Sequence, residues 1–90
     1  MEFKWNSNKA SINYQKHGVS FSEAITVFGD VLALTFDDPI HSENESRYLT
    51  FGLSNLQRFI IVSHTYQNDV TRIISARIMT PGERRIYENG

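Results

Sequence analysis

The chain has 90 residues, no cysteine and a formal net charge of −1, with nine Lys and Arg against ten Asp and Glu. This length fits one domain, residues 1–90, with a core of modest size. The lack of cysteine excludes disulfides and thiolate metal sites and is typical of a reducing cytosol. No stretch is apolar enough for a signal peptide or a membrane span, so we expect a cytoplasmic protein without membrane contact.

The charges are unevenly distributed along the chain. Residues 30–46 are acidic and contain no Lys or Arg, whereas residues 1–18 and 71–85 are basic. Phosphate binding depends on positive charge, and a neutral total is compatible with it where cationic side chains gather on one surface.

Two helices are predicted first. Asn6-Ser7 can cap a helix that reaches Lys16 or His17, where Gly18 would end it. A short helix over 21–28 should follow, because Ser20 can cap it and Glu23 stands at the capping-box position.

Four strands are predicted next, and a last helix after them. The runs 31–36, 46–53, 58–66 and 71–79 are β-prone, and the acidic stretch 37–44 reads as a loop. Short connections favour an antiparallel meander. The sequence Thr80-Pro81-Gly82-Glu83 is typical of a helix start, here of a helix reaching Tyr87. The order α-α-β-β-β-β-α predicts an α+β domain with a four-stranded antiparallel sheet packed by helices.

One stripe of the first helix gathers polar and cationic side chains. At about 100° per residue, Lys9, Asn13, Lys16 and His17 lie within a ~100° arc, with Ile12 near one edge. Such a stripe could grip a phosphodiester. Spacing alone favours a solvated face, in which the helix dipole stabilises Lys16 and His17.

Three arginines stand in runs that are otherwise apolar. Arg72 and Arg77 are five residues apart, so without a bulge they point to opposite sheet faces, and one lies on or beside the helix-packed face. Arg47 shares its face with apolar neighbours. Arginine binds phosphate through paired hydrogen bonds and stays charged when partly desolvated. An ion pair, for example with Glu45, explains one arginine equally well, whereas three together favour phosphate binding.

Other candidate residues carry weaker signals. His64, on a predicted strand, could be a general base, but a hydrogen-bonded structural histidine is the simpler interpretation. His41 lies in the acidic loop without the spacing of a metal site, so neither metal nor cofactor is expected. Phe3 and Trp5 are expected in the core, with base stacking as the alternative.

Several motifs follow one another in ordered spacing over nearly the whole chain. They are Phe3-x-Trp5-Asn6-x-x-Lys9, Asn13-x-x-Lys16-His17-Gly18-Val19-x-Phe21-x-Glu23-Ala24-x-x-Val27-Phe28, Glu45-x-Arg47, Arg72-Ile73-Ile74-Ser75-Ala76-Arg77 and Glu83-Arg84-Arg85-x-Tyr87. Together these motifs resemble the BrnT family. One departure is the turn Gln67-Asn68-Asp69, where family members often carry more basic residues.

The resemblance implies a RelE/ParE-like fold, a ribonuclease that inhibits translation and arrests growth, and a cognate antitoxin encoded beside it. It implies a BrnA-like antitoxin with a ribbon-helix-helix fold, in a 2:2 heterotetramer that represses its own operon. Operator DNA would be contacted only through the β-ribbon of the antitoxin. A partner would also protect strand edges, and we expect it to cover the surface of Lys16, Arg47, Arg72 and Arg77.

The predicted function is metal-independent RNA cleavage, by attack of a ribose 2′-hydroxyl on the adjacent phosphate. The arginines would stabilise the charge of the transition state, and His17 or Lys16 would move protons. A non-catalytic protein-binding module and a ParE-like topoisomerase poison are the alternatives. The expected catalytic residues are Lys16, His17, Arg47, Arg72 and Arg77, and the expected RNA-binding residues are Trp5, Lys9, Arg84 and Tyr87.

Overall fold

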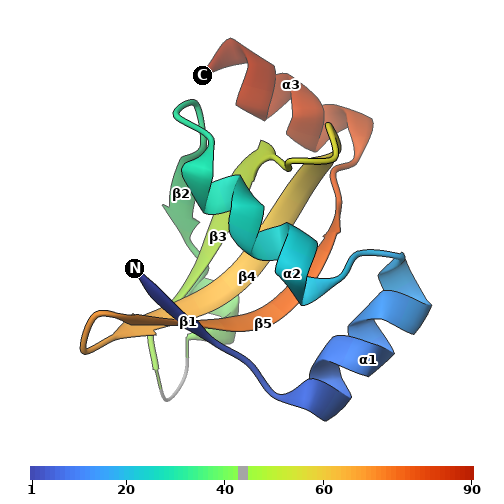
Figure 1. The fold of residues 1–90 in the computed structure, drawn as a ribbon. Coiled ribbons are helices and arrows are strands. Elements are labelled where there is room, and N and C mark those ends of the chain that lie inside the picture. The colour runs from blue at the N-terminus through green and yellow to red at the C-terminus, as the bar shows by residue number, and fades with distance from the viewer. Residues whose placement is uncertain (43–44) are drawn as a thin grey trace.

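A mixed five-stranded sheet organises the molecule in a computed structural model that describes residues 1–42 and 45–90 (Figure 1). No helix in this part of the chain has the length and apolarity needed to cross a bilayer. In chain order, the elements are β1 (Glu2–Lys4), α1 (Ser7–His17), α2 (Phe21–Ala24), the 3-10 helix η1 (Ile25–Gly29), β2 (Leu34–Asp37), the 3-10 helix η2 (Pro39–His41), β3 (Arg47–Leu53), β4 (Phe59–Gln67), β5 (Val70–Ile78) and α3 (Pro81–Asn89).

The strand order is β1-β5-β4-β3-β2. Strands β2 to β5 form the predicted antiparallel meander, but β1 adds a fifth strand parallel to β5, with Phe3 opposite Thr71. The predicted four-stranded antiparallel sheet is therefore wrong. Three residues are too few to show the alternation that identifies a strand, and the partner of β1 is almost seventy residues away in the chain.

Helix ends follow the local signals in the sequence. The Asn6 side chain accepts a hydrogen bond from the backbone N–H of Lys9 at 3.1 Å, and Gly18 ends α1 in the left-handed region, at φ 67°. Thr80 and Glu83 form a complete capping box at the start of α3.

The second predicted helix, 21–28, forms as α2 followed by η1. Ser20 accepts from the backbone N–H of Glu23 at 3.0 Å, but the Glu23 carboxylate does not return to the cap. It accepts instead from the Ser54 hydroxyl at 2.7 Å and from the Arg58 guanidinium. The buried carboxylate thus joins α2 to the β3–β4 turn, and hydrogen bonding to Arg58 lowers the pKa of Glu23.

The strand predicted at 31–36 begins later in the chain than predicted. Val31 and Leu32 are exposed in a turn where the Leu32 N–H donates to the Asp30 carboxylate at 3.0 Å, and β2 begins only at Leu34. The predicted loop 37–44 contains the end of β2 and η2, and its residues 43–44 lie outside the described residues.

The main core lies between the sheet and the helical segment α2–η1, which crosses one face in Figure 1. Gly52 of β3 permits this close packing, because a Cβ there would meet Val27 Cγ1 at 2.6 Å. Helix α1 lies beside β5, and α3 packs on the opposite sheet face, at one end. The buried core residues are Val19, Phe21, Ala24, Val27, Ile60, Val62, Ile73 and Ala76.

Candidate functional site

A β-bulge in β5 brings the arginines to one face of the sheet. Ser63 of β4 lies opposite Ser75, but the next residue, His64, lies opposite Ile73, so Ile74 is the extra residue. Side chains alternate along a strand, and one extra residue reverses the alternation. Arg72 and Arg77 therefore share the face opposite α1 and α2, one end of which is covered by α3, and the prediction that they point to opposite faces, made for a strand without a bulge, is wrong.

Arg47 belongs to the same face. The register places Arg47 of β3 opposite Thr65 of β4, and Thr65 opposite Arg72 of β5, so the three residues form one row across the sheet. We call this face, which carries Arg47, Arg72 and Arg77, the arginine face. Strands lie about 4.8 Å apart, so the backbones of Arg47 and Arg72 are separated by roughly 10 Å.

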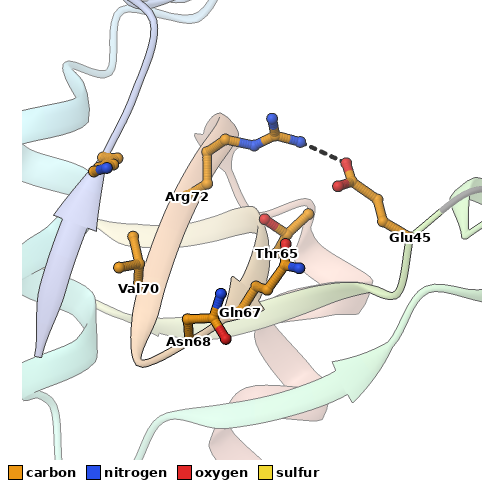
Figure 2. A pocket seen from close by; sticks show the side chains of 7 residues that line it. Glu45, Thr65, Gln67, Asn68, Val70 and Arg72 are labelled. Atoms are coloured by element: carbon orange, nitrogen blue, oxygen red, sulfur yellow. Dashed lines mark hydrogen bonds and ion pairs between the residues drawn. The ribbon is translucent and has the colours of Figure 1, made fainter.

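Two of these arginines converge on one carboxylate. The Arg72 guanidinium points to the Glu45 carboxylate (Figure 2). Arg72 Nη2 lies 2.5 Å from Glu45 Oε1, and Arg47 Nη2 lies 3.9 Å from the same oxygen. All three side chains are partly exposed, at 51% for Arg72, 31% for Arg47 and 38% for Glu45. An accessible anion-binding position therefore lies between β3 and β5. Sequence reasoning considered Glu45 only as an ion-pair partner and missed that it joins two arginines, because this depends on the strand register.

Arg77 is held differently. Its two terminal nitrogens donate to the two carboxylate oxygens of Glu83 at 2.7 and 2.8 Å. Hydrogen bonding to Arg77 is the main reason that the pKa of Glu83 is lowered to about 2. Glu83 also accepts from the backbone N–H of Thr80, so Arg77 connects β5 to the start of α3. Arg77 shares the face of Arg47 and Arg72, but its guanidinium points to its own acid.

The cationic stripe of α1 gathers as predicted, at the side of β5. Lys9, Lys16 and His17 line a hollow of about 210 Å³. The bulge residues Ile74 and Ser75 form its other wall, and by register Ser75 is also on the arginine face, between Arg72 and Arg77. The hollow and the arginine face thus meet along β5.

Asn13, in the same stripe, is buried and structural. Its Nδ2 donates to the carbonyls of Val19 and Ala76, each at 2.9 Å, and its Oδ1 accepts from the Ala76 N–H at 3.1 Å. The side chain therefore pairs with the edge of β5 beyond the end of β1, and part of the stripe faces the sheet instead of solvent.

The expected RNA-binding residues other than Lys9 are spread over the molecule. Trp5 is 37% exposed and packs edge-on against Phe21, in contrast to the expected core position. The Arg84 guanidinium lies over the Phe59 ring at 3.8 Å. The half-buried Tyr87 donates its hydroxyl proton to Asp30 at 2.5 Å, and burial with this hydrogen bond raises the pKa of Tyr87 to about 12. Trp5, Arg84 and Tyr87 do not join the Arg47–Glu45–Arg72 group.

The buried His64 is a hydrogen-bonded sheet residue, as the simpler interpretation predicted. Its Nε2 lies 2.7 Å from the Thr50 hydroxyl, and its ring packs between Phe28 and Tyr48. Burial lowers its pKa to about 4. His41 pairs with Asp38 at 2.9 Å.

Most of the chain matches one family of proteins. The family model of the BrnT ribonuclease toxins of type II toxin–antitoxin systems matches residues 5–83. The comparison with curated proteins found no match. Among solved structures, the chain is similar to the Brucella abortus ribonuclease toxin BrnT, with 22% identity and a TM-score of 0.69 over 89% of this chain and 97% of that one. At this identity the likeness concerns the fold, while the family model covers nearly the entire sequence: the chain belongs to the family of BrnT ribonuclease toxins of type II toxin–antitoxin systems.

Proposed function

We propose that this chain is an endoribonuclease that needs no metal and holds the scissile phosphodiester between Arg47 and Arg72. The observation that carries the proposal is the convergence of these two guanidiniums on the single Glu45 carboxylate. Guanidinium groups bind carboxylate and phosphate through the same paired geometry, so a position that attracts one anion suits the other. The substrate phosphate takes the place of the Glu45 carboxylate between the two arginines.

The chemical step is attack of a ribose 2′-oxygen on the adjacent phosphorus. A P–O2′ bond forms and the P–O5′ bond breaks, which leaves a 2′,3′-cyclic phosphate and a 5′-hydroxyl. The phosphorane-like transition state carries additional negative charge on the non-bridging oxygens. Arg47 and Arg72, fixed on rigid strands, stabilise this charge. Arg77, the third proposed arginine of the same face, contributes less because Glu83 offsets its charge.

Proton transfer is assigned to the stripe on α1. Lys16 and His17 line the hollow that adjoins the arginine face through Ser75. One of these groups removes the proton of the 2′-hydroxyl or supplies a proton to the leaving 5′-oxygen. Lys9, in the same hollow, binds a neighbouring phosphate. Trp5, Arg84 and Tyr87 stay as proposed RNA contacts outside this centre.

The proposal includes metal independence because guanidinium groups supply the positive charge. In this mechanism guanidinium groups do what Mg²⁺ does in metal-dependent nucleases. Within residues 1–42 and 45–90 there is no group of three or more His, Cys, Asp or Glu side chains that could hold a metal ion.

The deciding experiment follows the cleavage of total RNA and of a single-stranded oligonucleotide by purified protein in EDTA. We expect Arg72→Ala and Arg47→Ala to lower the rate about 100-fold or more, in line with the loss of one transition-state hydrogen-bond donor elsewhere. Both side chains are partly exposed, so folding should be nearly unchanged. Arg85→Ala is the matched control, because Arg85 is an exposed arginine of α3 outside the site. Parent-like cleavage by both site variants would overturn the assignment, and growth arrest with intact RNA would overturn nuclease function.

The partner of a type II toxin is an antitoxin, and we propose its kind and arrangement here. It is a BrnA-like ribbon-helix-helix protein that forms a 2:2 heterotetramer with the toxin and represses the shared operon. DNA is contacted through the antitoxin, which suits a toxin chain of net charge −1. The mass of the co-expressed complex and its binding to the operator, with and without toxin, test this proposal.

A further inference from the structure

A second hollow adjoins the Arg72–Glu45 pair on the side of the β4–β5 turn. It measures about 240 Å³, below the roughly 300–1,000 Å³ of typical small-molecule pockets, so it suits one planar group. Figure 2 shows Arg72 and Glu45 across one side and Gln67 and Asn68 at the turn. A group bound there would lie next to an anion held by Arg72.

The turn presents two side-chain amides on a rigid backbone. Asn68 and Asp69 both have positive φ, 55° and 64°, which is the conformation of a tight two-residue hairpin turn. The Tyr66 hydroxyl donates to Asp69 at 3.2 Å and closes the turn. Gln67 and Asn68 are exposed, and among the residues described neither side-chain amide takes part in a hydrogen bond. Both amides are therefore available to a ligand.

A side-chain amide carries a donor and an acceptor side by side. It therefore pairs with a nucleobase edge on which an acceptor and a donor are also adjacent. In adenine, the exocyclic amino group stands between two ring acceptors, so two amides can each make a donor–acceptor pair with it. Cytosine offers only one such edge, and in uracil the donor between the two acceptors has a single hydrogen, so it serves one amide at a time. Guanine is the base that arginine reads, and in the proposed function Arg72 is occupied by phosphate.

We infer that this hollow is a base-selecting subsite for adenine, placed beside the scissile phosphate. The inference rests on the proposed function and deepens it. Gln67 and Asn68 read the base edge, the Thr65 hydroxyl on the hollow's wall adds a polar contact, and Lys4 neutralises the backbone of the bound nucleotide. The β4–β5 turn with Gln67 and Asn68 then selects the RNA site, and the arginines carry out cleavage without regard to sequence.

The test measures binding of single-stranded 2′-O-methyl oligonucleotides, which lack the attacking hydroxyl and stay intact. We compare an oligouridine with the same oligomer containing one adenine, by fluorescence anisotropy. The parent should prefer the adenine oligomer by about 5- to 150-fold, the range of one good paired contact to a base. Gln67→Ala and Asn68→Gly should each remove most of the preference. Glycine tolerates the positive φ of residue 68, so the turn persists.

Gln15→Ala is the matched control, since Gln15 is an exposed amide on α1, and it should keep the full preference. Equal binding of both oligonucleotides by the parent, or an unchanged preference in both turn variants, would overturn the adenine subsite. Mapping of cut sites on an RNA of mixed sequence separates the two proposals. Cleavage at sites without an adjacent adenine would support the nuclease function and overturn the adenine subsite. Adenine-selective binding without any cleavage would support the subsite and overturn the nuclease function.

Discussion

At the scale of single residues, His64 shows how a titratable group is absorbed by the core. It is 5% exposed, it accepts or donates one hydrogen bond with Thr50, and the Thr50 hydroxyl in turn lies 2.8 Å from that of Thr35. These contacts join β2, β3 and β4 beneath Phe28 of η1. The imidazole serves this packing in its neutral form, so its protonation opposes folding.

The free energy of unfolding should fall as the pH falls from 6.5 to about 4, because of His64. Its pKa drops from 6.5 to about 4 on folding, so within this window the unfolded chain binds a proton that the folded chain does not. The loss amounts to about 3 kcal/mol in total, at 1.36 kcal/mol per pKa unit. Urea titrations at several pH values measure it. His64→Gln, which cannot titrate, should flatten the profile, and an equally steep profile in that variant would contradict the account.

At the scale of elements, the edge of β5 is protected by one side chain. Strand β1 pairs with β5 only at residues 70–72, and beyond this point the edge would be open to pairing with other chains. There the Asn13 side chain of α1 pairs with the backbone of Ala76. It donates to the Ala76 carbonyl and accepts from the Ala76 N–H, as a neighbouring strand would. A helix residue thereby completes the sheet next to the hollow of Lys16 and His17.

Asn13→Asp should destabilise the fold by at least about 2 kcal/mol. The aspartate still accepts from the Ala76 N–H, but it has no donor for the carbonyls of Val19 and Ala76, and it buries a charge. Urea unfolding at pH 7 measures the change. Asn8→Asp, an exposed position in the same helix, is the control and should leave stability within a few tenths of a kcal/mol. Equal stabilities of the two variants would show that the edge contact is dispensable.

Signals that act over a few residues could be read from the sequence, and pairings between distant residues could not. The caps at Asn6, Ser20 and Thr80 and the stop at Gly18 depend on immediate neighbours, and all are observed. The same holds for the meander of β2 to β5. Strand β1 depends on a partner far along the chain, and nothing within its three residues indicates it.

For the candidate site, the sequence likewise indicated the residues but not their arrangement in space. Residue type and local context singled out Arg47, Arg72 and Arg77 and the stripe on α1. Their relation in space required the bulge at Ile74, which has no signature in a run of ordinary β-prone residues. Without it, Arg72 and Arg77 diverge. The joint contact of Glu45 with two arginines likewise comes from the β3–β4–β5 register, which only the packed sheet defines.

At the scale of the whole molecule, the net charge of −1 is compatible with an excess of cationic side chains around the arginine face, where three arginines pair with only two carboxylates, those of Glu45 and Glu83. One sheet face, with one end covered by α3, carries or adjoins the cationic residues Arg47, Arg72, Arg77, Lys16 and His17. The side chains of Arg72 and Arg77 are about half exposed, at 51% and 41%. A surface of this kind attracts polyanions and acidic proteins alike, so one partner that occupies it excludes the other.

We therefore expect the antitoxin to cover the arginine face and the adjoining end of α1. Hydrogen–deuterium exchange of the toxin, alone and in complex, should show protection in residues 14–18 and 47–51 and along 72–77. Arg72→Glu should weaken antitoxin binding about tenfold or more, because a charge on a complementary interface is reversed. Arg85→Glu on the exposed side of α3 should change it little. Protection confined to other segments, such as the turn at 30–33, together with unchanged binding of Arg72→Glu, would mean that the antitoxin silences the toxin without touching the site.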